Sequence, residues 1–275
     1  MTVPDLVNAK MLSAKAAAFL WFAMQSDCSA VVCGNTGGGK TTLLNAMCDL
    51  IGMRERLILV EDTPELSPSQ SHVARLVAAR APMSDLIKDT LRMRPDRVIV
   101  GEVRNAEDSR ALFDCLLSGQ ARGTYSTFHS DSAQECLDRM RLLGATEHDL
   151  GALDLIACAR RIPVYDISRK AGTEVRRVTE ICEVFPKGGV ATPRQIFSYS
   201  AGNGRLDFLG LKKSGLSAKI RACLSNVRGR DFGAEWKRRE RFLCSKAHGG
   251  PFAEEVEKYL YGNHGKPGND SETGK

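Results

Sequence analysis

The chain has 275 residues, of which 43% are hydrophobic and 26% are charged, and its formal net charge is +6. This length is enough for one sizeable core, with or without a smaller appendage, and the composition is ordinary for a soluble globular protein. No apolar run approaches the roughly 20 residues that a membrane-spanning helix needs. The N-terminal residues also lack the pattern of a secretory signal peptide, so a cytoplasmic protein is expected.

The nine cysteines do not include a C-x-x-C pair. Most of them stand in apolar surroundings, which predicts buried, reduced thiols that pack as small hydrophobic side chains. Their spacing argues against a zinc site.

The first part of the chain, residues 1–29, predicts lead-in helices. The segment Thr2 to Asp5 has the pattern of a helix start, with Pro in the first turn. Ser13 is expected to cap a second helix over 14–24.

The stretch that follows predicts a nucleotide-binding element. Residues 30–33 are typical of a buried strand, GNTGGGKT at 34–41 has the G-x-x-x-x-G-K-[ST] pattern of a phosphate-binding loop, and a helix closing at Gly52 should follow. Glycines let backbone N–H groups approach phosphate oxygens, and the helix directs the positive end of its dipole toward them. Lys40 can reach the β- and γ-phosphates, and Thr41 can ligate Mg²⁺. The candidate nucleotide-binding residues are Gly34, Asn35, Thr36, Gly37, Gly38, Gly39, Lys40, Thr41 and Thr42.

Two further apolar runs end in acidic residues. Residues 57–60 precede Glu61 and Asp62, and residues 98–101 precede Glu102. Because parallel sheets bind ligands at the carboxyl ends of their strands, we expect these carboxylates at the ligand site. Glu102 would hold Mg²⁺ through water or orient the attacking water. A solvated turn with helix-capping acids is the alternative for the first pair.

The remaining elements follow in chain order. Helices are predicted at 84–93, 105–118, 132–143 and around 150–157, and strands at 125–128 and 176–185, while 72–80 remain unassigned. The strand at 125–128 would deliver His129 and Ser130 to the edge that carries Glu102. Further on, Asn203-Gly204 predicts a hairpin within 195–209, and 215–261 predict two or three helices.

These elements predict an α/β fold, with a mostly parallel sheet, helices on both faces and a small C-terminal hairpin and helical appendage. The expected division is 1–29 for the lead-in helices, 30–185 for the nucleotide-binding core, 186–261 for the hairpin and a basic helical region, and 262–275 for a disordered tail.

Four stretches stand in one order: GNTGGGKTTLLNA, LILVEDTPEL, LRMRPDRVIVGEVR and TYSTFHSDSA. From about residue 2 to 184 the chain resembles the type II/IV secretion system and type IV pilus/archaellum assembly ATPase superfamily, which consists of RecA-like P-loop ring ATPases. The last stretch looks more like archaeal members than bacterial ones. The resemblance implies Mg²⁺-dependent ATP hydrolysis by a homo-hexamer or mixed ring. It also implies an integral-membrane platform protein as partner, and so a place at the cytoplasmic face of the membrane.

The resemblance implies residue roles as well. Residues 34–42 match the Walker A motif, and Glu102 matches the Walker B glutamate. Glu61 and Asp62 match the acidic box that contacts Mg²⁺, and His129 matches the second histidine of the His box, although it could instead be a structural histidine. The implied catalytic residues are Glu102, Lys40, Glu61 and His129, and the implied metal ligands are Thr41, Glu61 and Glu102.

Several arginines resemble family arginines that form nucleotide and subunit contacts: Arg92, Arg94 and Arg104. Arg75 and Arg80 resemble a pair that could reach across a subunit boundary. The alternative for Arg92 and Arg94 is a pair of solvated charges at a helix end.

Two departures from the family pattern bear on activity. Gln120 stands where many bacterial relatives have the first histidine of the His box, and it cannot change its charge. By the same resemblance, the chain is expected to begin at the linker that follows an N-terminal domain in relatives, where that domain contributes arginines. Because an arginine finger is worth roughly 10³–10⁵ in rate, one alternative is a slow or non-hydrolysing ATP-binding assembly subunit that needs a partner's N-terminal domain.

Positive charge concentrates in residues 212–246. Docking onto a membrane platform or anionic lipid, binding of nucleic acid, and a solvated helical face all fit such a run. Because no nucleic-acid-binding module accompanies the charges, nucleic acid is the least favoured partner. A DNA-transfer ATPase of a conjugation-like system is nevertheless a third functional hypothesis.

Overall fold

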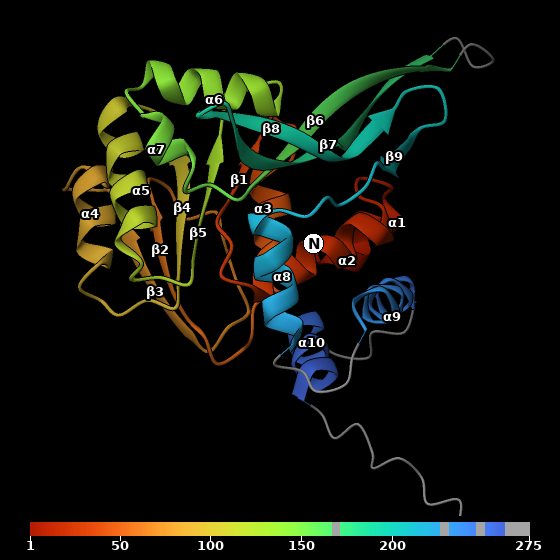
Figure 1. The fold of residues 1–275 in the computed structure, drawn as a ribbon, viewed down its shortest axis with the longest axis horizontal. Helices are drawn as coiled ribbons and strands as arrows, with labels where there is room; N and C mark the ends of the chain where they lie inside the picture. Colours follow the sequence, from red (N-terminus) through yellow and green to blue (C-terminus); the bar gives the residue numbers. More distant parts are fainter. Residues whose placement is uncertain (167–170, 226–230, 246–250, 262–275) are drawn as a thin grey trace, which may run out of the picture.

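The computed structural model describes the chain except for residues 167–170, 226–230, 246–250 and 262–275. Its described strands form one sheet in the order β3-β2-β4-β5-β1-β6-β7-β8-β9, covered by helices on both faces (Figure 1). The strands are β1 (Ala30–Cys33), β2 (Arg56–Glu61), β3 (His72–Val77), β4 (Arg97–Val103), β5 (Gly123–Phe128), β6 (Leu155–Asp166), β7 (Ala171–Lys187), β8 (Val190–Ser200) and β9 (Arg205–Phe208). The helices are α1 (Val3–Asn8), α2 (Ala14–Gln25), α3 (Lys40–Cys48), α4 (Met83–Thr90), α5 (Ala106–Ser118), α6 (Ala133–Leu142), α7 (Glu147–Leu150), α8 (Gly215–Ser225), α9 (Phe232–Cys244) and α10 (Phe252–Tyr261).

The parallel part of the sheet comprises β3, β2, β4, β5, β1 and β6. Strands β1, β2 and β5 are buried on both faces, as expected when helices cover a parallel sheet on both sides, and β1 and most of β2 are apolar runs. In the register, Cys33 of β1 lies beside Phe128 of β5, and Val60 of β2 lies beside Val100 of β4. The residues that follow these positions therefore meet at one edge of the sheet.

The antiparallel part of the sheet comprises β6 to β9. The predicted hairpin around Asn203-Gly204 is present between β8 and β9, where Gly204 has a φ of +65°. The expected domain boundary after residue 185 falls inside β7. The sheet and two hydrophobic cores include residues on either side of this boundary, and the division remains a prediction.

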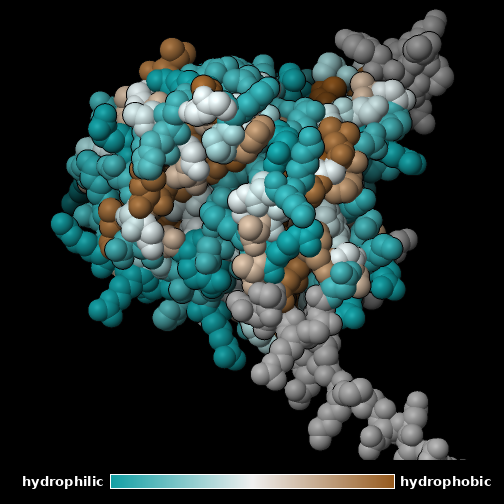
Figure 2. Space-filling model, viewed as in Figure 1, coloured by the Kyte–Doolittle hydropathy of each residue, from teal (hydrophilic) through white to brown (hydrophobic). Residues whose placement is uncertain are grey.

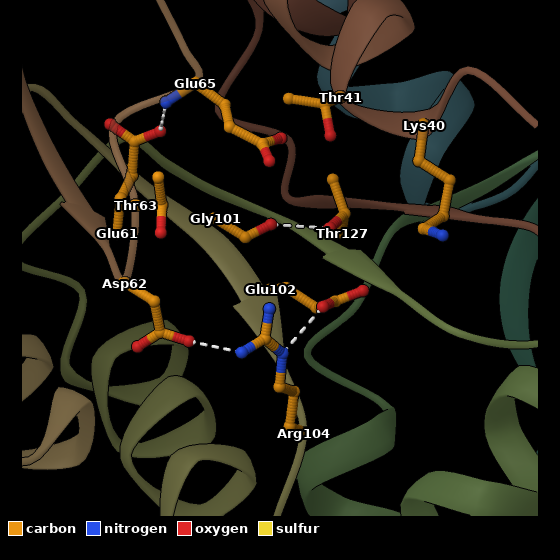
Figure 3. A pocket seen from close by; sticks show the side chains of 10 residues that line it. All are labelled: Lys40, Thr41, Glu61, Asp62, Thr63, Glu65, Gly101, Glu102, Arg104 and Thr127. Carbon is orange, nitrogen blue, oxygen red and sulfur yellow. Dashed lines mark hydrogen bonds and ion pairs between the residues drawn. The ribbon is translucent and has the colours of Figure 1, made fainter. Parts of the chain in front are cut away.

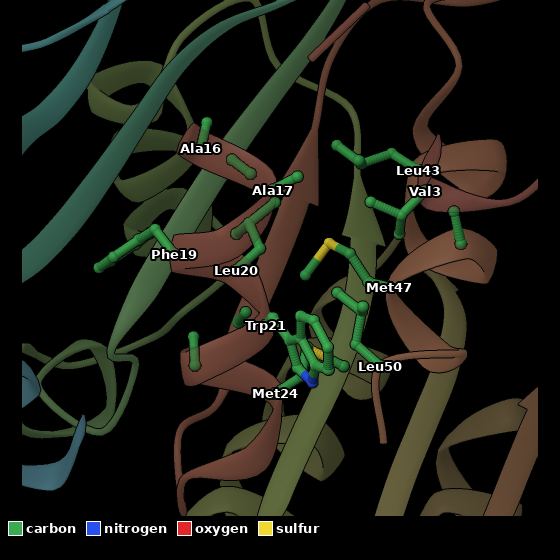
Figure 4. Close-up of a cluster of buried hydrophobic side chains, with 14 of the residues drawn as sticks. Val3, Ala16, Ala17, Phe19, Leu20, Trp21, Met24, Leu43, Met47 and Leu50 are labelled. Carbon is green, nitrogen blue, oxygen red and sulfur yellow. The ribbon is translucent and has the colours of Figure 1, made fainter. Parts of the chain in front are cut away.

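Two hydrophobic cores lie on opposite faces of the sheet. Helices α4 to α7 pack over one core, while α1 to α3 and α8 to α10 contribute to the other. Helix α2 is buried from Ala16 to Met24 and forms the centre of this second core (Figure 4). Trp236 of α9 stacks on Phe19 of α2 with ring centroids 5.8 Å apart, so the C-terminal helices share a core with the N-terminal ones.

The face seen in Figure 2 is largely hydrophilic, with apolar side chains in separate small areas. None of the described helices combines the length and the apolar character needed to cross a bilayer. The cysteines are free thiols, and only Cys223 and Cys244 are not buried.

One predicted element is wrong in type. The apolar residues around 150–157 do not form one helix, because α7 ends at Leu150 and Ile156 and Ala157 belong to β6, beside β1. Residues 155–159 alternate between the two cores, with Leu155 and Ala157 on one side and Ile156 on the other. An apolar run buried on both faces carries no alternating pattern, so it resembles a short buried helix.

Other differences concern element ends. Helix α4 is capped by Pro82 rather than Ser84, and it ends at Thr90 instead of continuing to residue 93. Helix α3 ends at Cys48, well before Gly52. The unassigned residues 72–80 contain β3, an edge strand. The predicted tail from residue 262 lies outside the described residues.

Candidate active site

The phosphate-binding loop joins β1 to α3 and is held by the backbone of β6. Gly34 has a φ of +151°, and a Cβ atom there would lie 1.8 Å from the carbonyl oxygen of Ala159. Asn35 fixes the next turn, because its Oδ1 accepts a hydrogen bond from the backbone N–H of Arg161 at 3.1 Å. Gly39, with a φ of +95°, is the N-cap of α3. The loop therefore needs glycine both for its backbone angles and for its contact with β6.

Replacing Gly34 with Ala is expected to lower the free energy of unfolding by about 2–5 kcal/mol, because backbone strain and overpacking add. Gly119→Ala is the matched control: Gly119 also has a positive φ, +66°, but no described atom lies within 4 Å of its added Cβ. The control should lose only about 1–2 kcal/mol. Denaturant unfolding measures both, and equal losses would contradict the close packing on Ala159.

Below the loop lies a pocket of about 180 Å³ at the carboxyl edge of the sheet (Figure 3). Side chains from the start of α3, from β2 and the loop after it, and from β4 and β5 converge there. Its lining consists of Lys40, Thr41, Glu61, Asp62, Thr63, Glu65, Gly101, Glu102, Arg104 and Thr127. The structure thus brings Lys40 and Thr41 together with Glu61, Asp62 and Glu102 at one site.

Glu102 lies within β4 rather than after it, just past a β-bulge that follows Val100. Its Oε2 accepts a hydrogen bond from Nε of Arg104 at 2.7 Å, and its Oε1 lies 3.1 Å from Nε2 of His129. Burial and the nearby Lys40 lower the pKa of His129, so its imidazole is neutral at neutral pH. The Nε2–H tautomer then donates to Glu102.

Lys40 lies beside this pair, with its Nζ 3.5 Å from Nε2 of His129. Because that nitrogen already carries a proton directed at Glu102, we do not regard this contact as a hydrogen bond. The ammonium instead donates to the carbonyl oxygen of Asn35 at 3.4 Å. Burial lowers the pKa of Lys40, while the Glu102 carboxylate opposes that shift.

Glu61 is buried and contacts groups of its own chain. Its side chain is 1% exposed, and its Oε1 accepts hydrogen bonds from the backbone N–H groups of Glu65 and Leu66, both at 2.9 Å. Its Oε2 lies 3.4 Å from Nε of Arg75, so that arginine has a partner in its own chain. The carboxylate thereby shapes the loop that follows β2. Glu65 also lines the pocket and is not among the predicted site residues, although its place in the acidic stretch 61–65 could have indicated it.

Other predicted residues lie away from the pocket. Arg92 and Arg94 precede β4, at the edge of the sheet opposite to Glu102. Gln120 precedes β5, and is therefore at the opposite edge from His129. Within one chain these side chains do not line the pocket, and contacts with another subunit remain a prediction.

The oxygen donors that line the pocket suit Mg²⁺ bound together with a nucleotide. They include the Thr41 hydroxyl and the carboxylates of Asp62, Glu65 and Glu102. In the part of the chain that the structure describes, no group of three or more His, Cys, Asp or Glu residues could hold a metal alone. Mg²⁺ is usually held by one or two carboxylates plus substrate phosphates, so this arrangement fits it.

Comparison with known proteins gives a consistent result. The family model described as "Type II/IV secretion system protein" matches residues 1–194. A putative conjugal transfer protein of Mycobacterium tuberculosis is 39% identical over 165 residues, which cover 55% of this chain and 45% of that protein. An uncharacterized protein of Methanocaldococcus jannaschii is 30% identical over 219 residues, covering 75% of this chain and 78% of that protein.

Among solved structures, the VirB11 ATPase from the Brucella suis type IV secretion system, in complex with sulphate, has the same fold. The TM-score is 0.52 at 24% identity, and the match covers 65% of this chain and 54% of the VirB11 chain. The chain thus spans about half the length of the mycobacterial relative and of VirB11.

Proposed function

The chain belongs to the type II/IV secretion system protein family and has the RecA-like fold of its ATPases, and from this premise we propose that it binds Mg²⁺-ATP and hydrolyses it. One observation carries the proposal. The phosphate-binding loop with Lys40 and the carboxylate of Glu102 face a single pocket at the carboxyl edge of the sheet. This is where a parallel sheet binds its ligand, and the two groups are those that phosphoryl transfer to water requires.

Each group has a defined task in the proposed reaction. Backbone N–H groups of residues 34–42 and the ammonium of Lys40 hold the phosphates and stabilise the charge that develops on the transferred phosphoryl group. Glu102 orients the attacking water and accepts its proton. His129, which donates to Glu102, keeps that carboxylate in place.

Thr41 and Glu102 are the proposed holders of Mg²⁺, the latter through water, with Asp62 and Glu65 facing the same space. When bound, the ion would neutralise phosphate charge. The predicted role of Glu61 changes accordingly. Because both of its oxygens are directed at the loop after β2 and at Arg75, we propose that it acts by presenting Asp62 and Glu65.

For the biological process, we propose a ring, homo-hexameric or mixed, that powers filament assembly or protein secretion. It would work on an integral-membrane platform protein from the cytoplasmic side. Family membership supports this at the level of secretion. The alternative assembly-subunit function would show tight ATP binding without turnover.

A conjugation-like DNA-transfer function is the other candidate, because the mycobacterial relative is named a conjugal transfer protein. The basic region gives it limited support. Arg239 is 3% exposed and pairs with Glu235 at 3.2 Å, so this cation acts inside the fold, and the exposed Lys219 already pairs with Asp154 at 2.8 Å. The exposed cations of α9 are Lys237, Arg238 and Arg241.

Two measurements test these proposals. Purified protein should bind ATP and release phosphate only with Mg²⁺, and absence of nucleotide binding would overturn the proposed function. DNA binding that falls steeply with salt and depends on Lys237, Arg238 and Arg241 would favour DNA transfer. Binding that is absent at moderate salt would remove that alternative.

A further inference from the structure

Arg104 forms a bridge between the two acidic elements of the candidate site. Its Nε donates to Oε2 of Glu102 at 2.7 Å, and one of its terminal nitrogens, Nη1, donates to Oδ2 of Asp62 at 2.6 Å (Figure 3). Asp62 and Arg104 line both the 180 Å³ pocket and a neighbouring pocket of about 620 Å³. The guanidinium therefore forms part of the wall between the two spaces.

Arg104 balances the negative charge of Glu102 and Asp62 at this edge of the sheet. Two cations line the smaller pocket, and Lys40 donates to the backbone oxygen of Asn35. Arg104 is the cation that contacts both Glu102 and Asp62. Its hydrogen bond to Glu102 raises its pKa further, so it stays protonated at every working pH. In the nucleotide-free protein its positive charge offsets the negative charge of these two carboxylates.

Glu102 and Asp62 also line the pocket in which a nucleotide-bound cation is proposed to lie. Arg104 and that cation therefore compete for one set of acceptors. The Arg104 side chain is 59% exposed, and an ion pair at this exposure is weak enough to be broken on binding. Its long side chain also adjoins the larger pocket, which offers space for its departure.

We propose that Arg104 is a positioning residue: it holds Glu102 and Asp62 in the nucleotide-free protein and gives up both carboxylates when Mg²⁺-nucleotide enters. This inference rests on the proposed function. It predicts that loss of Arg104 strengthens the response to Mg²⁺, because fewer contacts must then be broken. A residue that only gripped the phosphates would have the opposite effect when removed.

The test compares Arg104→Gln with wild type in binding of N-methylanthraniloyl-ATP, at fixed nucleotide concentration and increasing MgCl₂. The Mg²⁺ concentration for half-maximal binding should fall roughly two- to tenfold, the range expected for losing one or two exposed ion pairs. The half-maximal Mg²⁺ concentration of Arg104→Lys should lie between those of wild type and Arg104→Gln, because a lysine pairs only as a single point charge. Arg110→Gln is the charge-matched control, since Arg110 lines the larger pocket but makes neither contact.

The possible outcomes distinguish a failure of the Arg104 proposal from a failure of the proposed function. An equal fall in the Arg104→Gln and Arg110→Gln variants would overturn the bridge, because it would show a general charge effect. An unchanged or increased Mg²⁺ requirement in Arg104→Gln would also overturn it. A wild-type protein that binds no nucleotide would instead overturn the proposed function, before any variant is compared.

Discussion

Replacing Lys40 with Ala is expected to lower the ATPase rate by at least about 100-fold and to weaken ATP binding. Lys40 is only 8% exposed and is the residue of the phosphate-binding loop that brings a positive charge to the pocket. A cation from the solvent therefore cannot replace its ammonium group. Removing one preorganised stabilising group from a transition state typically costs about 10²–10³ in rate. Phosphate release and binding of N-methylanthraniloyl-ATP, measured on the same preparation, check both effects.

Lys88→Ala is the control for Lys40→Ala. Lys88 is exposed, pairs with Asp85 at 3.6 Å and lines the neighbouring pocket, so its loss changes the net charge equally. We expect wild-type turnover from this variant. Wild-type turnover by Lys40→Ala would contradict the assignment of the loop as the phosphate site.

Replacing Glu102 with Gln should separate binding from chemistry. An amide cannot accept the proton of the attacking water, and loss of a positioned general base typically costs about 10²–10⁴ in rate. The phosphate-binding loop is untouched, so ATP should bind at least as tightly as in wild type. Steady-state phosphate release, with nucleotide binding as the second readout, measures the separation.

Glu107→Gln controls for the loss of one negative charge near the site, because Glu107 is exposed on α5 and lines the larger pocket. It should leave the rate unchanged. If Glu102→Gln hydrolysed ATP at the wild-type rate, the base would lie elsewhere, and Asp62 and Glu65 would be the next carboxylates to replace.

The central features of the site could be predicted because they depend on local sequence. The phosphate-binding loop is contiguous in the sequence. Glycine is required at Gly34 because of its positive φ and because a Cβ atom there would collide with Ala159. The expectation that Glu61 and Glu102 follow parallel strands relies only on apolar runs and on the geometry of such sheets. The structure accordingly places these segments at one edge.

Side-chain direction could not be predicted in the same way. Whether Glu61 faces the pocket or its own loop depends on the hydrogen bonds to Glu65 and Leu66, which exist only once the turn has formed. The Arg104 bridge likewise needs the spacing between β2 and β4. Sequence matching placed Arg92, Arg94 and Arg104 together, but β4 separates Arg104 from the other two.

The remaining differences arise from long-range packing. Residues 155–159 are apolar on both sides, so local periodicity could not distinguish β6 from a helix until β1 was known to be its neighbour. The contact between Trp236 and Phe19 joins segments from opposite ends of the chain. No local pattern in 215–261 shows that these helices complete the core around α2.

The most direct test of the account is steady-state ATP hydrolysis by the purified chain with Mg²⁺ over a range of protein concentrations, with Glu102→Gln measured alongside. We predict turnover that rises more steeply than protein concentration, because the proposed ring would have to assemble, and that disappears in the variant. Tight ATP binding without phosphate release at every concentration would contradict the account. The chain would then be a nucleotide-binding assembly subunit rather than a motor.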